Sequence, residues 1–466
     1  MRTRAFHHPL RSGQRGSVLV IVLWIAFGLV SLALYFAHSM NFELRASDNR
    51  VSAMVAEQAI EGTARYLNYL LAQQTANNSN GVFLTLSENQ CKGVQVGDAR
   101  VWLIGRDTNT PVGPGRLCFG LVDEASKLNL NVAANRPLVA SNALIWLPRM
   151  TSDLTQAILD WASTNGTGPT VTYYAMQQPS YQCKCDPFET VDELRLLYGA
   201  DMDMLLGSDV NRNGILDPNE NDASQNGVLN PGLLEYVTVY SREPNSSKVN
   251  ISSLTSATAQ TLLTNFSTAR ATEILVNLGL GSSGAPRGNN RNQPAQAATA
   301  SFSSPLQFYA RSKMTMAEFA LIGTNITTTS GSYVDGRINV NTASAVVLSC
   351  LMGGDTAAAQ QLVSYRQANP NNLTSIAWVA DALGQTYAED LTLLQAGDYI
   401  TTQSYQCTAD IAAVGPYGRG YRRVKYIFDT SSGKPKIVYR QDLTQLGWAL
   451  GKEVRQTALL AKGTRT

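Results

Sequence analysis

The chain has 466 residues, and only 15% of them are charged. This length exceeds that of a single small core, so we expect two or more domains. The formal net charge is +2, and four arginines lie within the first 15 residues, so the rest of the chain is close to neutral. This balance argues against a protein that binds a polyanion through a basic surface.

The N-terminus combines a basic leader with a long uncharged stretch. Four arginines and no acidic residue precede Gly16, and residues 17–37 carry no charge. As a helix, this stretch is long enough to cross a hydrocarbon core of about 30 Å. A secretory signal peptide would instead have its cleavage site after the apolar stretch, at small residues. The excess of positive charge before the stretch predicts a cytoplasmic N-terminus and an exported bulk.

A glycine directly before the apolar stretch, followed by Ser17, resembles the class III leader of type IV pilins and pseudopilins. The resemblance implies that a prepilin peptidase cuts between Gly16 and Ser17 and that the apolar helix stays as anchor and assembly surface. In most members the fifth mature residue is a glutamate, which is thought to pair with a neighbouring subunit's amine, because an unpaired carboxylate in a membrane is costly. Here that residue is Ile21. This absence resembles the K-type minor pseudopilins of type II secretion and suits the end of a filament. An ordinary signal anchor is the alternative interpretation.

Beyond the membrane, small and apolar residues recur at helical spacing from Ala56 to Leu71. We expect one continuous helix of roughly 55 to 60 residues that ends in an Asn-rich turn. Strand-like runs at 82–86, 99–104 and 116–122 predict the first part of a β-domain. Further runs predict its completion near the C-terminus, and they lie at 399–411, 422–429 and 435–439.

A short phrase occurs three times, as KLNLNVA at 127–133, KVNISSL at 248–254 and RINVNTA at 337–343. Two short helical patterns around a polar break follow each copy, which indicates an extended segment that leads into a helix-hairpin-helix. The first and third copies resemble signature stretches of the K-type pseudopilins, in which an all-helical domain is inserted into a pilin-like β-domain. We therefore predict an α+β fold, with a long pilin-like N-terminal helix packed on an antiparallel β-sheet and a large inserted all-helical, helix-hairpin-helix-like domain that carries a calcium loop.

The predicted domain boundaries follow from these patterns. They are a prepilin leader at 1–16, a transmembrane anchor and spine helix at 17–80, the first part of the β-domain at 82–126, an inserted helical domain at 127–335 with a calcium loop at 209–235 and a mobile loop at 281–303, a helix-hairpin-helix-like segment at 336–396, the second part of the β-domain at 397–442, and a C-terminal tail without an assigned role at 443–466.

Residues 209–220 match the twelve-residue calcium loop of an EF-hand at each position. Alternate residues of a curled loop point inward, a glycine permits the sharp turn, and three carboxylates supply the charge that Ca²⁺ requires. We expect a structural Ca²⁺ site here, and a metal-free acidic turn is the alternative. The predicted ligands are the side chains of Asp209, Asn211, Asn213, Asp217 and Glu220 and the backbone carbonyl of Ile215.

A degenerate second loop begins thirteen residues after the first. Its twelfth position is Leu233, so the bidentate glutamate of the motif is missing, although Glu235 is near. A second cation remains an open alternative. Its candidate ligands are Asp222, Ser224, Asn226, Asn230 and Glu235.

The chain has six cysteines, an even number that is compatible with disulfides in an oxidising compartment. Possible disulfides are Cys91 with Cys118, which would link two strand-like segments, and Cys350 with Cys407, which would link a helix to a late strand, and the connectivity stays open. A direct bridge within the Cys-Lys-Cys sequence at 183–185 would be strained. No second Cys or His pair is spaced to complete a metal site there.

The exported part of the chain has no histidine for acid–base catalysis, because the three histidines lie at positions 7, 8 and 38. No GxSxG, HExxH or P-loop pattern is present, so we expect no enzyme. The family resemblance implies a minor pseudopilin at the tip of the type II secretion pseudopilus, which initiates or caps the filament and supports export of folded proteins across the outer membrane. It implies minor pseudopilins of I and J type as partners.

The same resemblance implies a single-pass protein of the inner membrane, with its N-terminus in the cytoplasm before processing and its bulk in the periplasm. The alternative function is an exported helix-hairpin-helix DNA receptor of a competence-type pilus. The Gly353-Gly354 pair fits the phosphate-binding turn of such a receptor, but Asp355 follows it and basic residues are sparse. We therefore expect no nucleic-acid partner.

Overall fold

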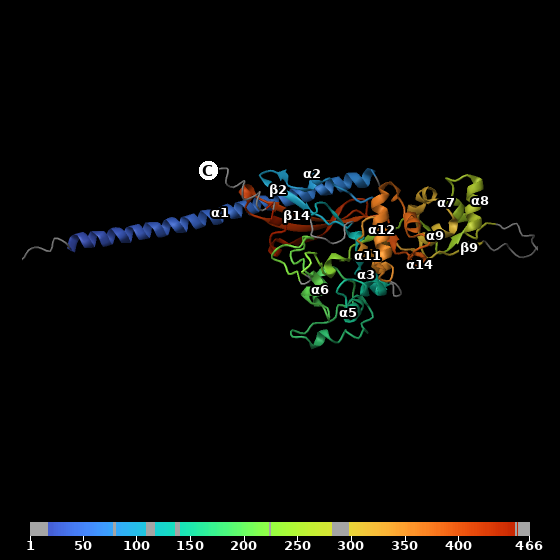
Figure 1. The fold of residues 1–466 in the computed structure, drawn as a ribbon, viewed down its shortest axis with the longest axis horizontal. Helices are drawn as coiled ribbons and strands as arrows, with labels where there is room; N and C mark the ends of the chain where they lie inside the picture. Colours follow the sequence, from blue (N-terminus) through green and yellow to red (C-terminus); the bar gives the residue numbers. More distant parts are fainter. Residues whose placement is uncertain are drawn as a thin grey trace, which may run out of the picture.

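The computed structural model describes residues 17–77, 81–108, 117–135, 140–222, 225–281, 298–452 and 454. Its first element, α1 (Ser17–Asn77), is a single helix of 61 residues, as the sequence predicts. Residues 18–51 are exposed along the whole length of a rod that projects from the body (Figure 1). The second half of α1 lies along the sheet, where Ala56, Ile60 and Ala64 are buried.

One antiparallel sheet of six strands supports this helix. The strand order is β1 (Val94–Val96), β2 (Ala99–Ile104), β14 (Gln406–Val414), β15 (Arg422–Asp429) and β16 (Lys436–Asp442), and β3 (Val122–Asp123) also pairs with β14. Because side chains alternate along a strand, Val101 and Leu103 face α1, whereas Trp102 and Ile104 face away from it. Ala449 and Leu450 of the C-terminal segment pack on this second face.

Three predicted strands differ from the structure. Residues 82–86 are not a strand, because Phe83, Leu84 and Leu86 pack on the core under α1 instead of pairing in the sheet, and α2 (Glu88–Cys91) follows them. The run at 116–122 contributes only β3 and a bridge from Phe119 to Ile104, and residue 116 lies outside the described residues. The run at 399–411 is divided into β13 (Ile400–Thr401) and β14.

Between β3 and β14, the repeated phrase builds three related units. Each copy forms a two-residue strand, which pairs in parallel with a second two-residue strand further along the chain. The three pairs are β4 (Leu128–Asn129) with β5 (Val237–Thr238), β7 (Val249–Asn250) with β10 (Ile326–Thr327), and β12 (Ile338–Asn339) with β13. Helices lie between the two strands of each unit, as the sequence predicts. They include α3 (Leu130–Asn135), α4 (Ala140–Ile145) and α5 (Ser152–Ala162), then α7 (Ser256–Leu262) and α8 (Thr268–Asn277), and finally α11 (Ala345–Leu351) and α12 (Thr356–Ala368).

The side-chain hydrogen bonds repeat together with the strands. The side-chain carbonyls of Asn129, Asn250 and Asn339 each accept the N–H group two residues further on, at 2.9–3.0 Å. The hydroxyl groups of the threonines in the partner strands do the same, at 3.0–3.2 Å. These partner strands share a second phrase that we did not expect from the sequence, YVTVYS at 236–241, NITTTS at 325–330 and YITTQS at 399–404. The inserted domain is therefore built from three copies of one unit.

The three units share one hydrophobic core that extends from Leu128 to Ile400, so the segments 127–335 and 336–396 pack as one body. In Figure 1, α7, α8 and β9 lie at the end of the molecule remote from the rod, and α5 and α6 lie to one side of the sheet. The α+β fold predicted from the sequence is confirmed. The other elements are η1 (Glu124–Ser126), η2 (Tyr174–Met176), η3 (Val191–Leu196), α6 (Met202–Leu206), η4 (Leu233–Glu235), β6 (Arg242–Pro244), β8 (Leu254–Thr255), β9 (Thr299–Ala300), α9 (Pro305–Ser312), α10 (Met316–Ala320), η5 (Gly323–Asn325), β11 (Tyr333–Asp335), η6 (Pro370–Asn372), α13 (Ala377–Leu383), α14 (Ala388–Gln395), η7 (Pro416–Gly418) and η8 (Thr444–Leu446).

Candidate functional site

The loop at 209–220 follows α6 and curls around its own carboxylates. The two carboxylate oxygens of Asp209 accept the N–H groups of Asn213 and Gly214 at 2.8 and 2.9 Å. Gly214 has a φ of +81°, which a side chain would strain, so the glycine permits the sharp turn. The loop therefore curls through the residues that the sequence motif assigns to the turn.

The remaining predicted side-chain ligands lie in the same loop. One carboxylate oxygen of Asp217 accepts the side-chain amides of Asn211 and Asn213 at 2.7 and 2.9 Å. The Glu220 carboxylate accepts the N–H groups of Asn211 and Asp217 at 3.2 and 2.9 Å. Asp209, Asn211, Asn213 and Asp217 are at most 9% exposed. The structure therefore brings five buried or half-buried polar side chains together.

The electrostatics of the loop favour a positive partner. Burial raises the pKa of Asp209, and the positive charge of Arg106 opposes this rise. Burial also raises the pKa of Glu220, and the negative charges of Asp209 and Asp217 raise it further. Carboxylates that repel one another away from solvent are the donor set that a hard cation neutralises.

The oxygens are nevertheless not arranged as metal ligands. Within the described part of the chain, no three His, Cys, Asp or Glu side chains converge as a metal site requires. Asn211 and Asn213 turn their amide N–H groups toward Asp217, and the carboxylates accept the loop's own N–H groups. The donor set thus fits Ca²⁺ in chemistry and sequence order, and calcium binding stays a prediction.

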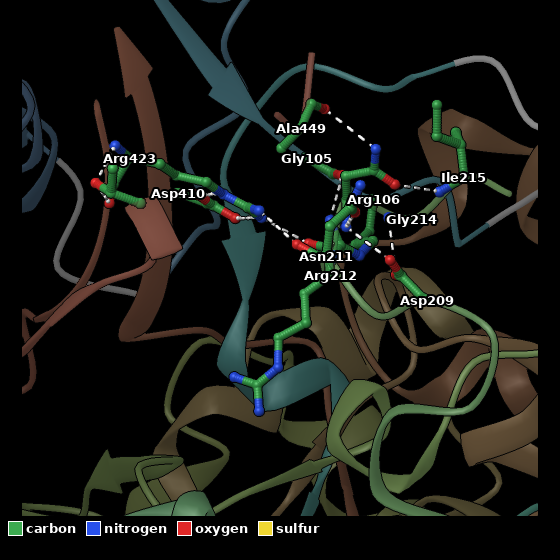
Figure 2. Close-up of polar contacts among 12 residues, drawn as sticks. Gly105, Arg106, Asp209, Asn211, Arg212, Gly214, Ile215, Asp410, Arg423 and Ala449 are labelled. Carbon is green, nitrogen blue, oxygen red and sulfur yellow. Dashed lines mark hydrogen bonds and ion pairs between the residues drawn. The ribbon is translucent and has the colours of Figure 1, made fainter. Parts of the chain in front are cut away.

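Two arginines from the sheet side hold the main chain of this loop (Figure 2). Arg423 of β15 donates to the carbonyls of Asn211 and Arg212, at 2.5 and 2.6 Å, and also binds both carboxylate oxygens of Asp410 on β14. Arg106, just after β2, donates to the Arg212 carbonyl at 2.9 Å and to Glu235 at 2.8 Å. Arg423 is completely buried, so these bonds are shielded from water.

The C-terminal segment contacts the loop from the other side. The side-chain amides of Asn211 and Asn213 lie 3.4 and 3.2 Å from the carbonyl oxygens of Trp448 and Ala449. Ala449 and Leu450 are buried on the sheet. Residues 448–450, to which the sequence assigned no role, therefore connect the loop to the sheet.

The second, degenerate loop is less complete. Asp222 and Asn226 accept the N–H groups of Gly227 and Val228, at 2.8 and 2.9 Å. The carboxylate of Glu235 forms a salt bridge with Arg106, so it is not a ligand of this loop in the structure. Asn230 pairs with Ser208 through its main chain. Ser224 lies outside the described residues.

The predicted disulfides are wrong for this structure. Cys91, Cys350 and Cys407 carry free thiols, which excludes both the Cys91–Cys118 and the Cys350–Cys407 bond. Cys350 lies in the core of the inserted domain, whereas Cys407 lies in the core between α1 and the sheet. The two thiols of this second pair thus belong to different cores.

The turn between α11 and α12 is already occupied by its own neighbours. The N–H groups of Gly354 and Asp355 donate within the turn, to Ser349 and Met352. The Asp355 carboxylate caps α12 by accepting the N–H groups of Ala357 and Ala358 at 2.7 and 2.9 Å. A Cβ atom on Gly354 would collide with the indole of Trp146, so this ring covers the turn. Little of the turn is left to bind a phosphate.

The N-terminal helix is long and apolar enough to cross a membrane. Its span begins at Val18, and its most apolar window has a mean hydropathy of 2.7 and no buried residue. Ile21 lies in this exposed part and is 57% exposed. Gly16, at the predicted cleavage site, lies outside the described residues.

Residues 338–395 match the family model described as Type II secretion system (T2SS), protein K. The chain is thus similar to protein K over this segment. This segment runs from β12 to α14 and corresponds to most of the third repeated unit. The match confirms the resemblance to K-type minor pseudopilins on which the sequence interpretation is based.

Comparison with solved structures matches the protein to the GspK-GspI-GspJ complex of the type 2 secretion system from enterotoxigenic Escherichia coli. The TM-score is 0.42 and the sequence identity is 10%, over 86% of this chain and 99% of that chain. No curated protein matches the chain.

Two groups of residues at the loop were not predicted from the sequence. Arg106 and Arg423 are far from the loop in sequence, and an isolated arginine carries no local pattern that would indicate its partner. The tail residues 448–450 follow the last strand without a motif. A signal that could have indicated the tail is the continuous apolar run at 101–104 in β2, because a strand that is apolar on both faces needs a cover on each.

Proposed function

We propose that this chain acts as a K-type minor pseudopilin at the tip of a type II secretion pseudopilus, where it initiates or caps the filament and supports export of folded proteins. The observation that carries the proposal is the protein K match on the third repeated unit. The exposed apolar rod of α1 supports it, because such a helix serves both as membrane anchor and as packing surface. In this proposal a prepilin peptidase removes residues 1–16, α1 spans the inner membrane once and the body lies in the periplasm. We propose no catalytic activity.

Two features support a position at the filament end. Ile21 stands where most subunits carry the glutamate that neutralises a neighbour's amine, so no such pairing is possible. The inserted domain extends the body beyond the sheet on the side remote from the rod (Figure 1). A domain of this size would hinder a subunit placed above it. The family resemblance names the I- and J-type minor pseudopilins as the partners on which the chain would pack.

The full-length protein, co-expressed with I- and J-type pseudopilins and extracted in mild detergent, tests this proposal by co-purification. We expect a ternary complex, and its absence in the presence of calcium would contradict the tip model. Ile21→Glu is the second test, with Ile25→Glu, at a similarly exposed position of the same helix, as the matched control. We expect Ile21→Glu alone to change filament length and secretion. Equal effects of the two variants would contradict a specific role for Ile21.

We further propose that the loop at 209–220 binds one structural Ca²⁺. Side-chain oxygens of Asp209, Asn211, Asn213, Asp217 and Glu220 and the Ile215 carbonyl would hold the ion, which would neutralise the three carboxylates. The degenerate loop after it would bind a second ion only if other oxygens replace Glu235, which is paired with Arg106.

Isothermal titration of the full-length protein with CaCl₂ after chelation measures this binding. Exported modules bind Ca²⁺ with dissociation constants of about 10⁻⁴–10⁻³ M, so we expect a value in that range and a higher melting temperature with excess calcium. Asp209→Asn should abolish the heat of binding, whereas the control Asp222→Asn should retain it. Retained binding in Asp209→Asn would contradict the assignment.

The occupied turn between α11 and α12 argues against the DNA-receptor alternative. Its N–H groups bond to Ser349, Met352 and Asp355, and Trp146 covers it. A titration with duplex DNA at 50 and 200 mM salt measures this point. We expect no salt-dependent binding, and tight binding with a steep salt slope would favour the receptor.

A further inference from the structure

The loop at 209–220 is the place where the inserted domain, the sheet and the C-terminal segment meet. Arg423 reaches it from β15, Arg106 reaches it from the end of β2, and the Trp448 and Ala449 carbonyls face its asparagines. The loop lies about midway along the chain, whereas these contacts come from residues 106 to 237 positions away. A change in the loop would therefore alter its contacts with the sheet and with the C-terminal segment.

The arginine contacts are directed at main-chain atoms. Arg423 uses two of its nitrogens for the carbonyls of Asn211 and Arg212, while Asp410 holds the guanidinium in place. Arg106 donates to the same Arg212 carbonyl, and its side chain lies 3.0 Å from where a Cβ of Gly214 would be. These carbonyls are not among the predicted ligands, since the motif uses the carbonyl of Ile215. The two arginines therefore hold the loop without competing for the predicted site.

The asparagine amides connect the predicted site to the C-terminal segment. The Nδ2 atoms of Asn211 and Asn213 each lie between the Asp217 carboxylate, at 2.7 and 2.9 Å, and a carbonyl of the C-terminal segment, at 3.4 and 3.2 Å. A carboxylate that is neutralised by a cation is a weaker acceptor for these amides. The state of Asp217 thus decides how fully the two amides bond to Trp448 and Ala449.

We propose that Arg106 and Arg423, together with the two asparagine amides, form a coupling clamp that transmits cation occupancy of the loop to β15 and to the C-terminal segment. Calcium then sets how firmly the inserted domain and the tail dock on the pilin-like sheet. This inference rests on the proposed calcium site. By linkage, loss of the clamp weakens calcium binding as much as calcium strengthens the docking.

Hydrogen exchange of the full-length protein in detergent, with CaCl₂ and with chelator, tests the clamp. In the wild type we expect calcium to slow exchange in the loop, and also about tenfold at residues 422–424 and 448–450. Arg423→Lys keeps the charge beside Asp410 but lacks the fork that reaches both carbonyls. In this variant calcium should still protect the loop, whereas the effect on the sheet and the tail should disappear.

The matched control is Arg366→Lys. Arg366 is also a buried arginine that donates to main-chain carbonyls, those of Val340 and Ala343 in the third repeated unit and that of Thr108 after β2, but to none in the loop at 209–220. We expect it to lower stability while the calcium response of residues 422–424 and 448–450 stays as in the wild type. Should Arg423→Lys fail to fold, Arg106→Lys gives the same comparison, because it keeps the charge next to Glu235.

Calcium affinity is the second readout. Arg423→Lys should weaken binding by about tenfold, the same factor as the lost protection, and Arg366→Lys should leave it unchanged. Calcium protection confined to the loop in the wild type, or the same response in Arg423→Lys and wild type, would overturn the clamp while leaving the calcium site intact. Absence of any calcium binding by the wild type would instead overturn the proposed site, and the clamp with it.

Discussion

Two short segments of this molecule have sequences that suggest a ligand, and the structure treats them differently. The turn at Gly353-Gly354 is enclosed by its own helices, with Asp355 as cap and Trp146 as cover. The loop at 209–220 is instead held from outside by arginines of the sheet, and burial together with the negative charges of Asp209 and Asp217 raises the pKa of its Glu220 carboxylate. Both have the residues of a binding motif, but only the loop has charge that its neighbours leave unbalanced. A motif thus indicates ion binding only where its charge, and not merely its hydrogen bonding, is left uncompensated by the neighbouring residues.

The largest expected effect in this comparison is that of Trp378→Ala, in α13 of the third unit. Trp378 is completely buried, stacks on Tyr365 and donates to Asn341 at 3.0 Å. If this unit serves packing, the substitution should lower the free energy of unfolding by about 3–5 kcal/mol, as measured by urea denaturation. Trp146→Ala, at a residue that is 52% exposed, is the control. Similar losses for both would contradict a structural role for the unit.

The cover over the turn is tested by Gly354→Ala. Gly354 and Gly433 have φ values of +91° and +81°, but an added Cβ meets Trp146 only at Gly354 and nothing at Gly433. We expect Gly354→Ala to lower the free energy of unfolding by about 1–3 kcal/mol. Gly433→Ala should lower it only by the part that backbone strain contributes. Combining Gly354→Ala with Trp146→Ala should remove the difference. An unchanged difference would show that Trp146 does not cover the turn.

The buried charge beside the loop is tested by Lys425→Met. Burial, with the positive charges of Lys127 and Arg212, lowers the pKa of Lys425 from 10.5 to about 8. Between pH 8 and 10.5 the unfolded chain therefore binds more protons, and the free energy of unfolding should rise with pH. Lys425→Met should remove this rise, because methionine does not titrate. Thermal melts at a series of pH values measure this dependence of stability on pH, and Lys434→Met, at an exposed lysine, is the control.

The smallest expected effect is that of Asp355→Ala, which removes the cap of α12. The free energy of unfolding should fall by about 1 kcal/mol. The fall should be the same with calcium and with chelator, because this carboxylate accepts N–H groups of its own helix. Asp209→Asn, in contrast, should abolish the calcium-dependent rise in melting temperature. Thermal melts in both conditions compare the two, and a calcium-dependent loss in Asp355→Ala would break the contrast.

Local patterns in the sequence were sufficient to predict the position of many single helices and strands. The predicted runs at 99–104 and 422–429 coincide with β2 and β15, and the predicted helix end coincides with Asn77. Residues 82–86 have the composition of a strand, but they lie where the core under α1 needs apolar side chains. Contacts between distant segments could not be predicted, because no local pattern around Arg423 indicates that it binds Asn211. The disulfides failed for the same reason, because an even number of cysteines does not say which of them share a core.

The position of β14 has a consequence for how the chain folds. This strand pairs with β2 and β3, which are more than 280 residues earlier, as well as with β15 directly after it. Closing so long a connection has a large entropic cost unless the intervening chain is already compact. We therefore expect the three repeated units to fold as the chain emerges and to bring their two ends together. The sheet under α1 would then close last, and a defect in any unit would also appear as slow assembly of the β-domain against which the units pack.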